Sequence, residues 1–224
     1  MKSYPTFKRF HGFTLIELIV VIAILATLMG IAYPAIMSYR ESANKAAADK
    51  IGKDIVGAVH QFRQDHNGIL PFDPQMAKPN REDQIFLNTD RGKDAHLVSI
   101  ITGYEEGDEK FNINNQAYMN PAKVEDRSNG LYGDSQSELG LYDPWGSPYY
   151  IVLCESDDGC IDPFTGKRYR GECCMVYSTG PDRAGIAPAH QGRKKKGKKS
   201  AALVEEEEDL IQDNVYSWKK ITKK

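Results

Sequence analysis

The strongest constraint on this chain is a nearly continuous apolar run, Phe13 to Ala32, directly after a short basic segment. The segment before it contains Lys2, Lys8 and Arg9 and no acidic residue. A run of about twenty residues is long enough to cross the hydrocarbon core of a bilayer, which is roughly 30 Å thick. Because basic flanks stay in the cytoplasm, we expect the chain after the run to be exported.

One acidic residue, Glu17, lies inside this run. A carboxylate within a membrane helix costs about 2.5 to 3.5 kcal/mol on insertion scales and usually has a partner. Secretory signal peptides place a small-residue cleavage site after the apolar stretch, whereas Gly12 precedes it here. Cleavage between Gly12 and Phe13 would keep the helix on the mature protein and create an α-amine near Glu17. In a bundle of such helices, the amine of one copy can neutralise Glu17 of the next.

The segment Gly12 to Leu25, GFTLIELIVVIAIL, resembles the prepilin signature shared by type IV pilins and type II secretion pseudopilins. The resemblance implies that a prepilin peptidase cleaves after Gly12 and N-methylates Phe13, and that Glu17 takes part in subunit assembly. The alternative is a plain signal peptide or a single membrane anchor, with a late cleavage site around Ala32 to Ala35. That alternative explains neither the junction at Gly12 nor the charge of Glu17.

Beyond the membrane segment, apolar residues continue at helical spacing: Ile51, Ile55, Ala58, Val59 and Phe62. Pro34 is expected to bend the helix, and Asn67-Gly68 to end it. The predicted domains are a removed leader at 1–12, a long helix at 13–68 that is transmembrane over 13–33, and a head at 69–224. The predicted fold class is α+β, with the helix packed on a small C-terminal antiparallel sheet as in pilins.

Three strands are predicted for that sheet, at Tyr149–Cys154, Cys173–Ser178 and Val215–Trp218, because β-branched and aromatic residues follow turn-rich stretches there. A short helix is predicted from about Asp94 to Tyr104. The remainder of residues 72–141 shows neither helical nor strand periodicity, so we expect irregular structure.

The tail resembles the major, G-type pseudopilin of type II secretion, whose pattern D-P-W-G-x-P-Y matches Asp143 to Tyr149. Two further stretches, Ser178 to Asp182 and Asp213 to Trp218, match the same family. The resemblance implies a calcium ion held by Asp182, Asp213 and the carbonyl of Thr179, since calcium prefers oxygen ligands. A charged loop at 184–209 replaces the family's compact loop at that place, and a plain turn role for the aspartates is the alternative.

The four cysteines, Cys154, Cys160, Cys173 and Cys174, lie close together in the sequence. Their spacing fits no standard zinc pattern. In an exported head we expect two disulfides that close the strand hairpin, with three possible connectivities.

The charged loop carries a basic run, Arg193 to Lys199, followed by an acidic run, Glu205 to Glu208. The two runs can screen each other, and the net charge is only -2, so we expect a solvated loop and no nucleic-acid binding. The histidines are scattered, and the sequence contains no nucleophile motif, phosphate loop or dinucleotide fingerprint. We therefore expect no enzymatic activity.

These features predict a structural filament subunit of a type II secretion pseudopilus. Its expected partners are copies of itself, other pseudopilins, a prepilin peptidase and an inner-membrane assembly platform. It would cross the bacterial inner membrane once, with the head in the periplasm, and then enter a periplasmic filament. The alternatives are a type IV pilin of surface fibres, for adhesion, motility or DNA uptake, and a membrane-anchored binding domain that never polymerises.

Overall fold

The computed structural model of the protein describes residues 13–75, 79–80, 83–90, 96–108, 110–155, 158–187 and 214–218. The chain divides into two compact units, Met1–Ala43 and Asn44–Lys224. The predicted leader at 1–12 lies outside the described residues, and so does the charged loop from 188 to its end at 209.

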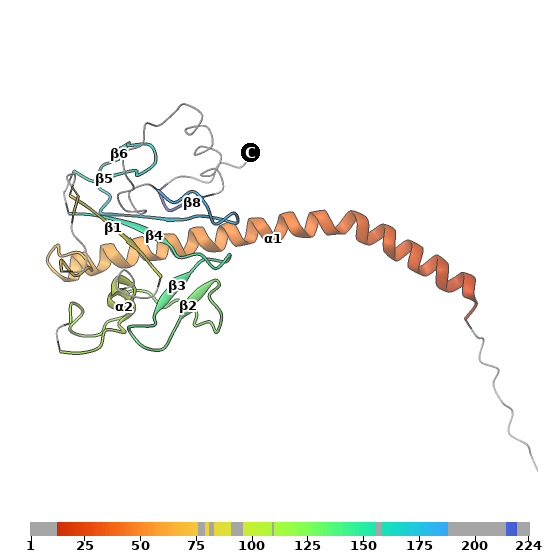
Figure 1. The fold of residues 1–224 in the computed structure, drawn as a ribbon, viewed down its shortest axis with the longest axis horizontal. Coiled ribbons are helices and arrows are strands. Elements are labelled where there is room, and N and C mark those ends of the chain that lie inside the picture. Colours follow the sequence, from red (N-terminus) through yellow and green to blue (C-terminus); the bar gives the residue numbers. More distant parts are fainter. Residues whose placement is uncertain are drawn as a thin grey trace, which may run out of the picture. The chain divides into compact units, whose positions relative to one another are not determined.

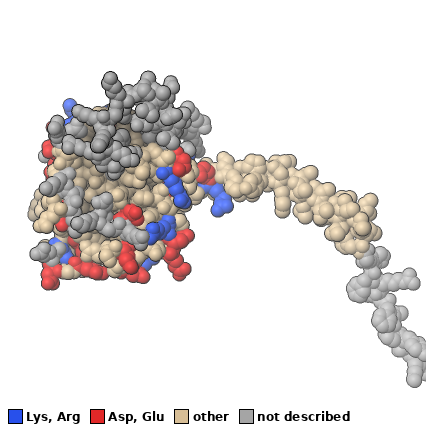
Figure 2. Space-filling view, viewed as in Figure 1, with Lys and Arg blue, Asp and Glu red and all other residues tan. Residues whose placement is uncertain are grey.

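Helix α1, Leu15–Asp65, begins in the first unit and continues through Pro34, where a bend was predicted (Figure 1). Its large apolar side chains in the first unit are exposed, with Ile16 at 69% and Ile31 at 78%. On the face drawn in Figure 2, the first half of the helix presents an uncharged surface. By length and composition, this is the one helix among the described residues that can cross a membrane. A helix that is apolar all round needs lipid or other helices as its surroundings.

The second half of α1 belongs to the head and is amphipathic. Its buried residues form one stripe: Ala48, Gly52, Ile55, Ala58, Val59 and Phe62. The predicted stripe is therefore confirmed for Ile55 to Phe62. The helix ends where Asn67 and Gly68 take positive φ angles of 54° and 89°. The amide of Gly68 then donates to the carbonyl of Arg63 at 2.8 Å, which satisfies one of the free carbonyls at the helix end.

The head contains a four-stranded antiparallel sheet in the order β1-β4-β7-β8 (Figure 1). Its strands are β1 (Gln84–Asn88), β4 (Tyr150–Cys154), β7 (Cys174–Ser178) and β8 (Val215–Tyr216). Two small hairpins pair β2 (Gly130–Tyr132) with β3 (Gly140–Tyr142), and β5 (Cys160–Ile161) with β6 (Arg168–Tyr169). Helix α2 covers His96–Thr102. The predicted α+β class and the three predicted strands are confirmed. The expectation of irregular structure over 72–141 is wrong for β1, β2 and β3.

The sheet separates two apolar clusters, because successive side chains of a strand point to opposite faces. Ile151, Leu153 and Val176 pack in the same cluster as Ile55 and Val59 of α1. The other cluster contains the alternate residues: Val152, Cys154, Cys160 and Met175, with Phe86, Tyr169 and Trp218 at its margin. The helix therefore docks on one face of the sheet, and the opposite face carries a second, smaller core.

Candidate functional site

The first turn of α1 is held by reciprocal hydrogen bonds between Thr14 and Glu17. The Oε2 atom of Glu17 accepts from the amide of Thr14 at 2.8 Å and from its hydroxyl at 2.7 Å. The amide of Glu17 donates to Oγ1 of Thr14 at 3.3 Å. This is a capping box, in which two groups at a helix start satisfy each other's backbone donors. The T-x-x-E spacing that signals it is present in the sequence, and our sequence analysis missed it.

The capping box places the Glu17 carboxylate beside the residue that follows Phe13. Phe13 itself is 80% exposed, and Gly12 lies outside the described residues. Cleavage after Gly12 would put a new α-amine within one residue of Thr14. The start of a helix favours negative charge because its amide dipoles point there. The carboxylate is therefore held at the end of the helix where a positive partner would appear.

The Asp143 side chain organises the turn that leads into β4. Its Oδ1 atom accepts from the amides of Trp145 at 3.0 Å and Ser147 at 2.8 Å, and its Oδ2 atom accepts from the hydroxyl of Ser178 at 2.6 Å. Burial raises the pKa of Asp143, and these hydrogen bonds only partly offset that rise. Gly146 completes the turn at a φ of 83°. The D-P-W-G motif thus ties the entry of β4 to the end of β7.

A second buried carboxylate, Glu105, holds the loop that follows α2. It accepts from the amides of Asn112 at 2.7 Å and Phe111 at 3.2 Å, and Nε2 of His96 lies 3.4 Å from its Oε1. Burial acts to raise the pKa of Glu105, but the hydrogen bonds from His96 and the two amides outweigh it, so the pKa lies below its usual value. This carboxylate therefore stabilises the loop in its ionised form.

The three residues predicted to bind calcium have different surroundings. Thr179 is 1% exposed, and its Oγ1 atom is buried without a hydrogen-bond partner. Asp182 is exposed, and its Oδ1 atom accepts from the amide of Ala184 at 2.9 Å in a local turn. Asp213 lies outside the described residues. Among the described residues, no three His, Cys, Asp or Glu side chains gather as a metal-binding group. Calcium binding here stays a prediction, in which Thr179 contributes its carbonyl oxygen.

Cys154 and Cys160 form a disulfide, whereas Cys173 and Cys174 are free and buried. The expectation of two disulfides is therefore wrong, and one is present among these cysteines. The Cα atoms of the bridged pair are 5.5 Å apart, within the usual range. Adjacent residues have Cα atoms only about 3.8 Å apart, too close for ordinary disulfide geometry. The two pairs also belong to different clusters, with the bridge in the smaller core and the thiols in the core next to α1.

Cys173 contacts a histidine and, through it, an acid. Its Sγ atom lies 3.5 Å from Nδ1 of His60, and Nε2 of His60 lies 3.8 Å from the carboxylate of Glu172. A nucleophilic cysteine needs an accessible thiolate. Cys173 is only 2% exposed, and burial raises the pKa of its thiol. These contacts therefore pack a protonated thiol and do not activate it.

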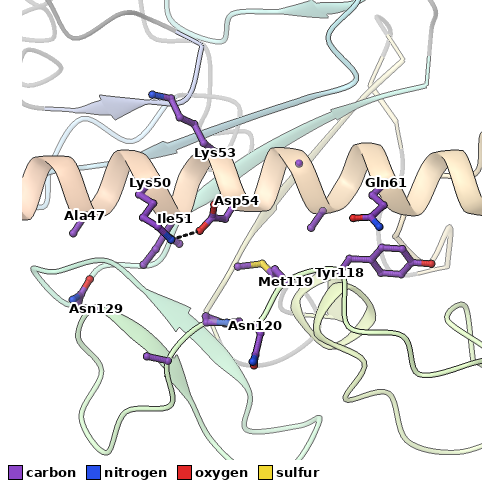
Figure 3. Close-up of a pocket in the computed structure, with 14 residues that line it drawn as sticks. Ala47, Lys50, Ile51, Lys53, Asp54, Gln61, Tyr118, Met119, Asn120 and Asn129 are labelled. Carbon is purple, nitrogen blue, oxygen red and sulfur yellow. Dashed lines mark hydrogen bonds and ion pairs between the residues drawn. The ribbon is translucent and has the colours of Figure 1, made fainter.

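A groove of about 640 Å³ lies beside α1 in the head (Figure 3). Small residues of the helix line it, including Gly57 and Ala58, and the segment from Tyr118 to Ala122 forms its opposite wall. Lys50 and Asp54 at its rim pair with each other at 2.8 Å (Figure 3). The groove therefore offers small apolar side chains and a neutral charge pair, without a concentration of one charge.

Comparison with known proteins identifies one segment of the chain. The family model for the prokaryotic N-terminal methylation motif matches residues 7–33. No curated protein and no solved structure matches the chain. The motif and the apolar helix together support membrane anchoring, and the motif suggests a structural rather than an enzymatic protein. The N-terminal segment therefore carries a prepilin-type signature, which implies processing by a prepilin peptidase and assembly into pilin-like filaments.

Proposed function

We propose that this chain is a structural filament subunit of a type II secretion pseudopilus. The observation that carries the proposal is the apolar, exposed first half of α1 with Glu17 held in its first turn by Thr14. Such a helix can move from lipid into a bundle of identical helices, because its apolar side chains are shielded from water in both places. The matched methylation motif at residues 7–33 supports the same role.

Charge pairing explains how copies would find their register. An unpaired carboxylate in an apolar bundle is unfavourable, and an amine from a neighbouring copy removes that penalty. After cleavage, the α-amine of Phe13 in one copy would meet Glu17 of the next, at one fixed stagger of the helices. The capping box keeps the carboxylate at the correct end of its helix until then. The partners of this step are further copies of the chain, other pseudopilins and an inner-membrane assembly platform.

Two sequence stretches of the head favour a secretion pseudopilin over the pilin of a surface fibre. The D-P-W-G stretch around Asp143 builds the turn into β4, and Asp143 also contacts Ser178, where the second matching stretch begins. Motifs that resemble the G-type pseudopilin are therefore joined in space. The proposed location is the inner membrane, with the head in the periplasm. Long extracellular fibres containing this chain, seen by immunogold electron microscopy, would instead favour the type IV pilin.

The test of assembly compares two variants that separate the charge of Glu17 from its hydrogen bonds. Glu17→Gln removes the charge and keeps the size, whereas Thr14→Val removes the hydroxyl of the capping box and keeps the charge. We expect Glu17→Gln to abolish sheared or crosslinked filaments and Thr14→Val to retain most of them. Equal yields from wild type and Glu17→Gln would refute the pairing. Tryptophan fluorescence checks that the head is folded in both variants, since Trp145 and Trp218 belong to it.

The test of processing is mass spectrometry of the membrane-extracted N-terminus, from cells with and without a prepilin peptidase. We expect methylated Phe13 as the first residue only when the peptidase is present. Gly12→Leu should leave the precursor uncut. An N-terminus beyond Ala32 would show an ordinary signal peptide and reject the class.

We also propose, from the family resemblance, that the head binds calcium through the carbonyl of Thr179 and the carboxylates of Asp182 and Asp213. Calcium prefers oxygen ligands of this kind, and Asp182 lies in the turn three residues after Thr179. Calorimetric titration of chelator-treated protein measures the affinity. Absence of heat and of any calcium-dependent rise in melting temperature would reject it.

A further inference from the structure

The exposed apolar surface of α1 continues beyond residue 33, where the predicted membrane segment ends. Ile36, Met37 and Tyr39 are 55%, 43% and 76% exposed. They lie in the same compact unit as that segment, Met1–Ala43, and α1 is continuous through them. A contiguous exposed apolar surface indicates a partner that excludes water. The positions of the charges along the helix show which partner fits.

Two charged residues, Glu17 and Arg40, bound a stretch of α1 that contains no Asp, Glu, Lys or Arg. This uncharged stretch, residues 18–39, has a length of roughly 33 Å at 1.5 Å per residue. The hydrocarbon core of a bilayer is roughly 30 Å thick. Residues 18–39 can therefore cross the hydrocarbon core without placing a charge inside it.

The predicted segment, residues 13–33, has nearly the same length but matches a bilayer less well. It places Glu17 about 6 Å inside the hydrocarbon, and a carboxylate there is unfavourable without a partner. The hydrogen bonds from Thr14 to Glu17 bring no positive charge to it. The same segment also leaves Ile36 and Tyr39 in water. Moving the two boundaries to residues 18 and 39 removes both penalties.

The polar side chains of the uncharged stretch agree with these boundaries. Oγ1 of Thr27 donates to the carbonyl of Ile24 at 2.8 Å, so its hydroxyl is satisfied within the helix, as hydrocarbon requires. Tyr39 lies at the border with the head, and tyrosine is enriched where a membrane meets water. Arg40 follows it at the level where lipid phosphates lie. Both ends of the stretch therefore carry groups that suit the lipid headgroups.

We infer that a phospholipid bilayer covers residues 18–39 of α1, so that Glu17 lies among the cytoplasmic headgroups and Tyr39 among the periplasmic ones. The inference rests on the inner-membrane location proposed above and does not depend on filament assembly. Glu17 is hydrated in this state and needs no amine beside it. The requirement for a positive partner begins only when the helix leaves the lipid for a bundle of helices.

The experiment measures labelling of single introduced cysteines by a membrane-impermeant maleimide. The full chain is reconstituted in phosphatidylcholine vesicles, and its own cysteines give little background because two are bridged and two are buried. Ser42→Cys should react, and its extent of labelling gives the fraction of chains with the head outside. Ala35→Cys should react at least about tenfold more slowly, because a thiolate does not form in hydrocarbon. Val21→Cys is the protected control, and all three should react equally in denaturant.

The labelling pattern separates the inference from the proposed location. Labelling of Ala35→Cys at the rate of Ser42→Cys, with Val21→Cys protected, leaves the membrane location standing and overturns the boundary at residue 39. Labelling of all three at one rate overturns both. Protection of Ala35→Cys that disappears when the protein is diluted into more lipid shows that a second copy covers this surface, and it also overturns the inference.

Vesicle insertion tests the position of Glu17. The fraction of chain that floats with vesicles should be the same for Glu17→Gln and wild type, because the carboxylate lies outside the hydrocarbon. Ile36→Glu should lower the ratio of bound to free chain at least about tenfold, whereas Ser42→Glu, the matched control, should not. A clear rise in insertion for Glu17→Gln, or none of the expected loss for Ile36→Glu, overturns the inference. Neither result depends on whether filaments form.

Discussion

Reduction of the Cys154–Cys160 disulfide should lower the free energy of unfolding of the head by about 2 kcal/mol. The bridge closes a short loop, with a sequence separation of 6. The chain-entropy relation gives about 2.4 kcal/mol at 25 °C for a closed loop of about seven residues. The effect comes mainly from the unfolded chain, which the bridge prevents from opening that loop.

The assay is urea unfolding of the full chain in mild detergent, followed by the fluorescence of Trp145 and Trp218, with and without reductant. Wild type should lose about 2 kcal/mol on reduction. Cys154→Ala with Cys160→Ala should be less stable than oxidised wild type and insensitive to reductant. The matched control is Cys173→Ala with Cys174→Ala, which should keep the full response to reductant. Redox sensitivity that persists without Cys154 and Cys160, or four free thiols in the oxidised protein, would refute the reasoning.

Three further predictions concern the head. Ile55→Ala should cost 2 to 5 kcal/mol in urea unfolding, because Ile55 is fully buried, whereas the partly buried Ile51→Ala should cost less. Because the pKa of Glu105 is lowered in the folded head, ionised Glu105 stabilises the head above its unfolded-state pKa. This stabilisation is lost as pH falls through the folded-state pKa of Glu105. Glu105→Gln should therefore lower stability at pH 7 by about 1 to 3 kcal/mol and flatten the acid-side loss in pH-dependent unfolding. The pKa of Asp143 is raised in the folded head, so its contribution to the free energy of unfolding is full below the unfolded-state pKa. That contribution declines as pH rises through the folded-state pKa. Asp143→Asn should remove this decline in pH-dependent unfolding.

The helix was predictable because its signals are local. The apolar run, the spacing from Ile55 to Phe62 and the stop at Asn67-Gly68 each depend on residues within a few turns of one another. The capping box of Thr14 and Glu17 was equally local and was overlooked because Glu17 was considered only as a buried charge. Glu17 therefore has two roles, as a helix cap and as a charge in an apolar segment.

The remaining differences arise from contacts distant in sequence. Strand β1, Gln84–Asn88, has only three apolar residues in its sequence, which is too short a run to predict a strand. It forms a strand because β4 pairs with all five of its residues. The cysteine pairing depends on which apolar cluster each sulfur joins, and this follows from contacts between strands and not from the spacing of the cysteines in the sequence.

The separation of the sulfurs by the sheet links the order of folding to the order of oxidation. In an extended chain all four thiols are open to an oxidant, and three fully bridged pairings compete. Once β4 and β7 pair and dock on α1, all four cysteines are buried, with Cys154 and Cys160 at bridging distance in one core and Cys173 and Cys174 in the other. A chain that folds as it is oxidised would therefore reach a single covalent form, whereas oxidation before folding would trap mispaired chains.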